Sequence, residues 1–138
     1  MTEQEIRTIL NRQREYFATG ATLSRKFRAE QLGKLKASLQ RHEEELNAAL
    51  QQDLGKSRME SYMCEIGLTL SELTWMQKHL RGLMQEKRVP TPLSQFAAIS
   101  FRSPSPYGTV LIMSPWNYPV LLTLDPLIDA IAAGNTAV

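Results

Sequence analysis

The sequence has one cysteine, no long apolar run and almost no net charge, and each shortage excludes a class of protein. Cys64 has no partner for an internal disulfide, so the fold does not need an oxidising compartment. The longest apolar runs, residues 110–113 and 120–122, fall far short of the roughly 20 residues that cross a bilayer. Residues 1–11 lack the apolar centre of a secretory signal. We therefore expect no membrane segment and a cytoplasmic location.

The low net charge disfavours nucleic-acid binding, and the shortage of metal-ligating side chains disfavours metal binding. The formal net charge is only +2, and acidic residues interrupt the basic residues of the first third, as on solvated helix faces. His42 and His79 have no further ligand at metal-binding spacing. An acid, Glu65, stands beside Cys64 and disfavours a thiolate there, so Cys64 is expected to be a small packed side chain. We expect no nucleic-acid partner and no metal.

The composition divides the chain near residue 92. Apolar residues at three-and-four spacing predict a helical region over residues 1–92. One helix ends at Gly20, and a second runs from about residue 24 to 53 with a break near residues 40–42 and a stop at Gly55. A third spans about residues 59–84 and ends before Pro90 and Pro92.

Residues 93–138 have the pattern of an α/β unit. An arm over residues 93–101 is followed by a β-branched run, residues 109–113, that predicts a buried strand. A proline-bounded turn leads to an apolar helix at residues 120–132, with a kink or restart at Pro126, and Gly134 closes it before a second strand at 136–138. Asp125 and Asp129 are expected on the polar edge of this helix. One strand, a crossover helix and a half-made strand form an incomplete parallel unit, so we expect a truncated chain.

The turn after residue 113 is the place where an α/β sheet binds ligands, because it follows the carboxyl end of a strand. Pro115 and Pro119 stiffen it and display Trp116 and Asn117. The Asn117 amide can donate hydrogen bonds to an oxyanion without carrying a charge. A structural role is equally open, in which Asn117 caps the following helix and Trp116 fills the core.

Two coupled motifs make the chain resemble the aldehyde dehydrogenase superfamily. They are Pro-Trp-Asn-Tyr-Pro at 115–119 and Ala-Ile-Ala-Ala-Gly-Asn-Thr-Ala-Val at 130–138, after a Pro-Tyr-Gly-Thr-Val entry at 106–110. Residues 49–56 and 65–66 resemble the branch with the class 3 and coniferyl aldehyde dehydrogenases. The resemblance implies amino-terminal helices, a hairpin arm and the start of a Rossmann-like sheet, incomplete here, as an amino-terminal fragment of that fold.

The resemblance also implies chemistry. A cysteine thiolate attacks an aldehyde, hydride passes to NAD or NADP, and water hydrolyses the thioester to a carboxylic acid. Asn117 would be the oxyanion donor, Tyr118 would border the aldehyde pocket, and the cofactor would lie along Met113, Ser114, Pro115 and Trp116.

The family's nucleophile and ribose-binding residues have no counterpart within residues 1–138, so we expect this chain alone to be inactive and the complete enzyme to be a homodimer. The alternative is a non-catalytic helical interaction or oligomerisation module. A phosphate loop at residues 132–136 is disfavoured, because the glycine pair and the lysine are missing.

Overall fold

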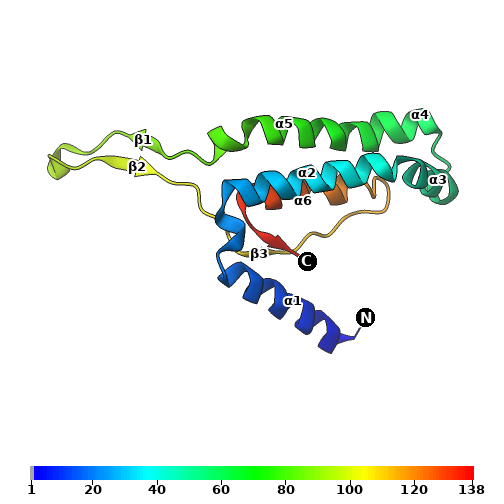
Figure 1. Ribbon diagram of the computed structural model, residues 1–138, viewed down its shortest axis with the longest axis horizontal. Coiled ribbons are helices and arrows are strands. Elements are labelled where there is room, and N and C mark those ends of the chain that lie inside the picture. Colours follow the sequence, from blue (N-terminus) through cyan, green and yellow to red (C-terminus); the bar gives the residue numbers. More distant parts are fainter. Residues whose placement is uncertain (1) are drawn as a thin grey trace.

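The computed structural model describes residues 2–138, and helices make up most of it (Figure 1). The first half contains α1 (Glu3–Ala18), a 3₁₀ turn (Ala21–Leu23), α2 (Arg25–Arg41) and α3 (Glu43–Leu54). The chain then continues with α4 (Arg58–Ser61), a π-helical turn (Tyr62–Ile66) and α5 (Gly67–Leu83). The later elements are β1 (Lys87–Val89), a 3₁₀ turn (Leu93–Gln95), β2 (Ser100–Arg102), β3 (Thr109–Val110), α6 (Leu121–Ala133) and β4 (Thr136–Ala137).

The predicted helix boundaries are confirmed, and several of them coincide with a recognisable cap. Gly20 and Gly55 adopt left-handed φ angles of 72° and 66° at the ends of α1 and α3. The Ser24 hydroxyl accepts a hydrogen bond from the Phe27 N–H and starts α2. The expected break falls at His42, which separates α2 from α3. No helix in the described part of the chain is long and apolar enough to cross a membrane.

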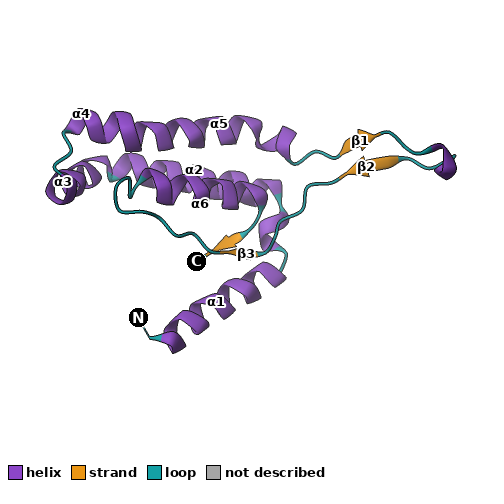
Figure 2. Cartoon of the chain, turned by 180° about the vertical axis from the view of Figure 1, so that it is seen from behind, coloured by secondary structure: helices purple, strands orange, loops and turns teal. Residues whose placement is uncertain are grey.

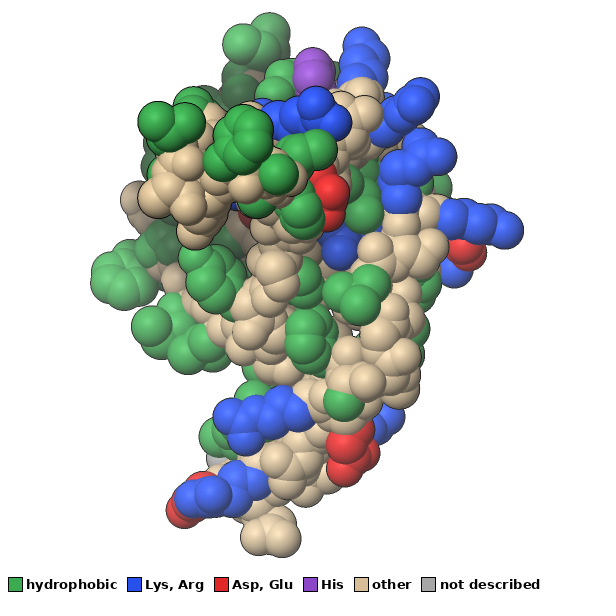
Figure 3. All heavy atoms as spheres, turned by 90° about the vertical axis from the view of Figure 1, so that its left-hand side faces the viewer, with side chains coloured by type: hydrophobic (Ala, Val, Ile, Leu, Met, Phe, Trp, Pro, Cys, Tyr) green, Lys and Arg blue, Asp and Glu red, His purple; other side chains and the backbone are tan. Residues whose placement is uncertain are grey.

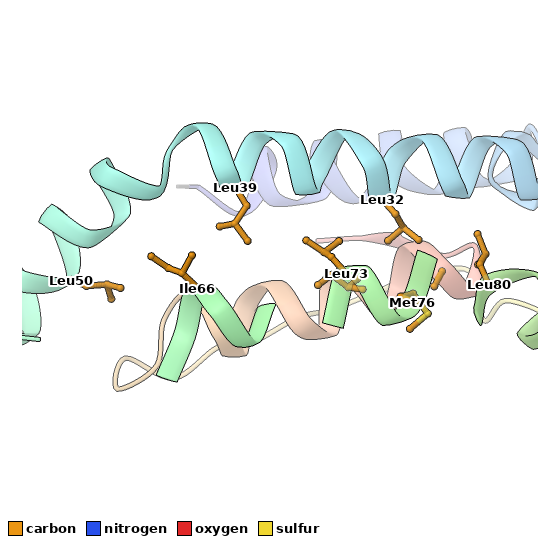
Figure 4. Packing of buried hydrophobic residues seen from close by; sticks show 9 residues of the cluster. Leu32, Leu39, Leu50, Ile66, Leu73, Met76 and Leu80 are labelled. Atoms are coloured by element: carbon orange, nitrogen blue, oxygen red, sulfur yellow. The ribbon is translucent and has the colours of Figure 1, made fainter. Parts of the chain in front are cut away.

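The hydrophobic core lies between α2, α5 and α6, which pack against one another (Figure 4). Leu32 and Leu39 of α2 point toward Leu73 and Met76 of α5, and all four are buried. Ile128 of α6 is also fully buried and belongs to the same cluster. Because α6 follows residue 92, the two predicted regions share one core here; their division into domains stays a prediction.

A hairpin arm projects from the end of α5, as the sequence predicts (Figure 2). β1 and β2 pair antiparallel, with Arg88 opposite Phe101. The loop between them carries Leu93, Phe96 and Ile99, whose exposed fractions are 87%, 87% and 65%. Seen from the arm, hydrophobic side chains gather on the upper left of the surface, whereas Lys and Arg side chains lie along the upper right and again near the bottom (Figure 3).

The start of a parallel sheet is present, though it is less buried than the sequence pattern predicts. β3 pairs parallel with β4, and the Ile112 N–H continues the ladder to the Val138 carbonyl. Leu111 and Met113 are 68% and 84% exposed, because this chain covers only part of the surface around the strand. The expectation that residues 109–113 are buried is therefore wrong for this chain, and the regular strand ends at Val110.

The helix after the turn also differs from expectation at one point. α6 runs unbroken from Leu121 to Ala133 and contains Pro126, with no restart at Asp125. Proline removes one N–H from the helix, but the partly buried Leu124 before Pro126 and the buried Ile128 and Ala132 after it hold both halves of α6 against the core. Packing outweighs the missing hydrogen bond. Gly134 then ends α6 with a φ of 88°, as predicted.

Candidate active site

The candidate site is the loop of residues 111–120 that joins β3 to α6 (Figure 1). It follows the carboxyl end of β3, where parallel sheets bind their ligands. Met113 and Trp116 are 84% and 86% exposed, and Ser114, Pro115 and Asn117 are exposed as well. These side chains therefore face away from the packed helices.

The Asn117 side chain makes no hydrogen bond within residues 2–138, although its backbone is firmly held. The first residue before α6 is Val120, whose own side chain makes no capping hydrogen bond. Trp116 is too exposed to fill the core. In the described chain, neither half of the structural alternative is present: the amide of Asn117 does not cap α6 and the indole is not packed.

A buried ion pair anchors this loop to the helices. The Lys56 ammonium donates to Glu65 Oε1 at 2.5 Å and to the backbone carbonyl of Asn117 at 2.9 Å. The Lys56 and Glu65 side chains are only 8% and 0% exposed. Lys56 Nζ also lies 4.0 Å from the centre of the Tyr118 ring, a cation–π distance. One ammonium thus holds Asn117 and Tyr118 together.

The other oxygen of Glu65 caps the start of α6. Glu65 Oε2 accepts hydrogen bonds from the N–H groups of Val120, at 2.8 Å, and Leu121, at 3.3 Å. A negative charge is favourable at a helix N-terminus, where the first N–H groups have no intrahelical partner. The residues on both sides of the turn are therefore fixed to one carboxylate, directly or through Lys56.

Local backbone features direct the Lys56 and Glu65 side chains toward each other. Lys56 follows Gly55 directly, and its N–H closes the end of α3 onto the Leu50 carbonyl, which directs the chain toward the core. Glu65 lies in the π-helical turn, a feature frequent at functional sites. Gly67 permits this turn, because a Cβ there would meet the Tyr62 carbonyl oxygen at 2.7 Å.

The far end of α6 is held by a second cation. Arg28 is 7% exposed, and its guanidinium donates to the Ala132 carbonyl at 3.0 Å and the Thr22 carbonyl at 2.8 Å. Burial lowers the pKa of Arg28 from its ordinary value. The Asn135 side chain accepts from the Gly108 N–H at 2.9 Å and ties the end of α6 to the start of β3. α6 is thus fixed at both ends.

The carboxylates of α6 lie apart from the loop. Burial raises the pKa of Asp125, and the nearby charges of Glu72 and Asp129 raise it further. Partial desolvation also raises the pKa of Asp129, although this residue is largely exposed at the helix edge, as predicted. One Asp125 oxygen is buried without a hydrogen bond inside residues 2–138. The described residues contain no group of three or more His, Cys, Asp or Glu that could hold a metal.

The sequence located the loop but not the pair that holds it. Lys56 and Glu65 stand among the residues that carry the family resemblance, and Glu65 also stands beside Cys64, but neither is predicted as a site residue. A signal for Glu65 is present in the pattern, because it stands four and eight residues before the buried Thr69 and Leu73, on the core side of the helix. A buried carboxylate requires a partner, but spacing does not reveal which cation supplies it.

Known proteins resemble this chain in sequence and in fold. The model of the aldehyde dehydrogenase family matches residues 1–138. This chain belongs to the aldehyde dehydrogenase family. Curated aldehyde dehydrogenases similar to it include the 4,4'-diaponeurosporen-aldehyde dehydrogenase of Staphylococcus aureus, 46% identical over 123 residues that make up 89% of this chain. Human aldehyde dehydrogenase family 3 member B1 is 44% identical over 129 residues, or 94% of the chain.

A solved aldehyde dehydrogenase has the same fold in this region. The structure described as the substrate-bound state of Staphylococcus aureus AldH superposes with a TM-score of 0.93 and 43% identity over 96% of this chain. The chain spans 27% and 28% of the length of the two curated relatives and 29% of that solved chain. The predicted family and fold are confirmed, because the family model matches the chain and its elements superpose on part of that solved chain.

Proposed function

We propose that this chain works as the amino-terminal part of an aldehyde dehydrogenase that oxidises an aldehyde to a carboxylic acid with NAD or NADP, and that Asn117 stabilises the oxyanion. The observation that carries the proposal is the contrast at Asn117. Its backbone carbonyl is anchored to Lys56, whereas its exposed side-chain amide has no partner within residues 2–138. Such an amide is held in place before negative charge appears on a substrate.

The chemistry follows from the properties of the amide. When a cysteine thiolate adds to an aldehyde, the carbonyl oxygen becomes negative and the carbon tetrahedral. The Asn117 N–H₂ donates to this oxygen and carries no charge, so it does not hold the oxygen too tightly when the carbonyl re-forms. The product of oxidation is a thioester, and water cleaves it to the carboxylic acid.

The nucleophile is not supplied by residues 1–138. Cys64, the single cysteine, is half-buried in the π-helical turn, next to the carboxylate-bearing Glu65. Attack requires a base within hydrogen-bond reach of the thiol, and Cys64 makes no hydrogen bond to a base in the described part of the chain. We therefore propose that the 138-residue chain alone does not oxidise aldehydes, and that the complete enzyme, meaning these residues joined to the rest of an aldehyde dehydrogenase chain, does.

The residues before Asn117 suit a dinucleotide. Met113, Ser114, Pro115 and Trp116 form an exposed, mostly apolar stretch beyond the carboxyl end of β3, which matches the flat apolar face of a nicotinamide ring. The bound dinucleotide would accept hydride from the substrate carbon. Tyr118, 37% exposed and held by Lys56, would form a rigid edge of the aldehyde pocket.

The hairpin arm supports assembly of the complete enzyme as a homodimer. Leu93, Phe96 and Ile99 are exposed together in the short loop at its end, and a group of exposed apolar side chains gains from being covered by a second copy. The same feature favours the alternative function, a non-catalytic interaction module. A cytoplasmic location stays a prediction from the sequence.

Asn117→Ala in the complete enzyme tests the proposed function. Loss of one oxyanion donor is expected to lower kcat by about 10²–10³. Dinucleotide binding, followed by quenching of tryptophan fluorescence, is expected to stay unchanged, because the amide acts on the aldehyde oxygen. Glu44→Gln, which removes an exposed partner of Arg58, is the matched surface control. Unchanged kcat in Asn117→Ala would favour the interaction module.

A further inference from the structure

Lys56 and Glu65 stand at the centre of the hydrogen bonds that hold the loop, yet neither is a candidate for chemistry. Glu65 is fully buried, and both of its oxygens are engaged: Oε1 by Lys56 and Oε2 by the Val120 and Leu121 N–H groups. The Lys56 ammonium in turn reaches the carbonyl of Asn117. The pair thus connects α3 and the π-helical turn to the residue that carries the proposed oxyanion donor.

A buried ion pair is a costly way to gain stability alone. Removing two charges from water is unfavourable, and apolar residues of similar volume often stabilise a fold as well as an ion pair does. What an ion pair adds is directional geometry. Lys56 can satisfy Glu65, the Asn117 carbonyl and the Tyr118 ring only with the main chain of residues 117–118 in one position.

Fixing the main chain of the loop also restricts the Asn117 side chain. With the Asn117 carbonyl and the Val120 and Leu121 N–H groups fixed on one ion pair, the peptide planes around residue 117 have little freedom to rotate. The Asn117 amide then has only its own side-chain torsions left to explore. Precise placement of a donor is worth much in rate, since an error of about 1 Å can cost about 10²-fold.

We propose that Lys56 and Glu65 are a positioning pair for Asn117. The contact between Lys56 and the Asn117 carbonyl sets the main chain at residue 117, and the hydrogen bonds from the Val120 and Leu121 N–H groups to Glu65 fix the start of α6. This inference rests on the proposed role of Asn117 as the oxyanion donor. Neither Lys56 nor Glu65 touches the substrate. Their effect on the reaction passes through the loop.

A double-mutant cycle in the complete enzyme tests the pair. Lys56→Met keeps the length of the side chain and removes the charge and the donor. It is expected to lower kcat at least about 10-fold, with the KM for the aldehyde changed by less than about 3-fold. In the Asn117→Ala background the same substitution is expected to change kcat by less than about 3-fold, because the group that it positions is already gone.

The outcomes separate this inference from the proposed function. An equal loss of kcat from Lys56→Met in both backgrounds, with Asn117→Ala still impaired, would overturn the positioning pair and leave the oxyanion role standing. Full activity of Asn117→Ala would instead overturn the oxyanion role and the inference built on it. Glu44→Gln serves as the control, since it breaks an exposed ion pair with Arg58 on the surface.

A second variant covers the case in which Lys56→Met does not fold. Glu65→Gln keeps an acceptor oxygen for the Val120 and Leu121 N–H groups and removes the charge opposite Lys56. It is expected to lower kcat with little change in KM, and to speed hydrogen exchange in peptides covering residues 117–124 but not in those covering α2. Normal kcat together with faster exchange at residues 117–124 would also refute the inference, because a loosened loop would then not matter for turnover.

Discussion

The stability of the 138-residue chain should depend on Lys56 far more than on any exposed cation. Lys56→Met leaves the fully buried Glu65 carboxylate without its countercharge. Removing one partner of a buried ion pair typically costs about 3–5 kcal/mol. Here the Val120 and Leu121 N–H groups still donate to Glu65, so the lower end, about 3 kcal/mol, is expected.

Chemical denaturation gives the assay. With a urea m-value of about 2 kcal/mol/M, a loss of about 3 kcal/mol moves the unfolding midpoint down by about 1.5 M. Glu44→Gln, at a pair whose side chains are both 70% exposed, should move the midpoint little, because solvent screens exposed ion pairs.

The change in stability caused by a second substitution can refute this reasoning. Adding Glu65→Gln to Lys56→Met removes the uncompensated charge but keeps an acceptor oxygen for the helix N–H groups. The double variant should therefore be more stable than Lys56→Met alone. A double variant that is less stable, or a Lys56→Met loss below about 1 kcal/mol, would show that desolvation of the ion pair does not govern this region.

Three further outcomes are expected. Asp125 has a raised pKa, so the native state binds more protons than the unfolded chain and loses stability as pH rises from the ordinary value of 3.8 through the raised pKa. Asp125→Asn should flatten this loss of stability with pH and be more stable than wild type at neutral pH. A steeper loss in the variant would contradict this prediction. Gly134→Ala should cost about 1–3 kcal/mol in denaturation, because φ is 88° and a Cβ would clash with Arg28, whereas Gly82→Ala, with open space around it, should not destabilise the chain. Phe96→Ser should weaken dimers of the complete enzyme in sedimentation without changing its circular dichroism; dimers of unchanged affinity would exclude the arm from the interface.

Most helices were predictable because their signals are local. The caps at Ser24, Gly55 and Gly134, and the loss of apolar phase before His42, lie within a few residues of the boundaries that they set. The exposure of Leu111 and Met113, just after β3, was not predictable in the same way. A β-branched run reports the burial that residues 109–113 can accept, whereas actual burial depends on which neighbours the chain contains.

The candidate site was predictable in part, for a related reason. The loop around Asn117 follows from two prolines and the end of a strand, all within a short stretch of sequence. The pair that anchors it joins Lys56 to Glu65 and to a carbonyl 61 residues away. The direction of Glu65 depends on the π-helical turn, which changes the helical spacing and has no strong sequence signature.

The proposed oxyanion role of Asn117 is tested most directly by the order of kcat among wild type, Asn117→Ala and Asn117→Asp in the complete enzyme. A donor to an oxyanion cannot be replaced by a carboxylate of nearly the same shape, since like charges repel. We therefore predict that kcat falls from wild type to Asn117→Ala and that Asn117→Asp is no faster than Asn117→Ala. If Asn117 had a structural role, its near-isostere would retain more activity than alanine, and an Asn117→Asp enzyme clearly faster than Asn117→Ala would contradict the account.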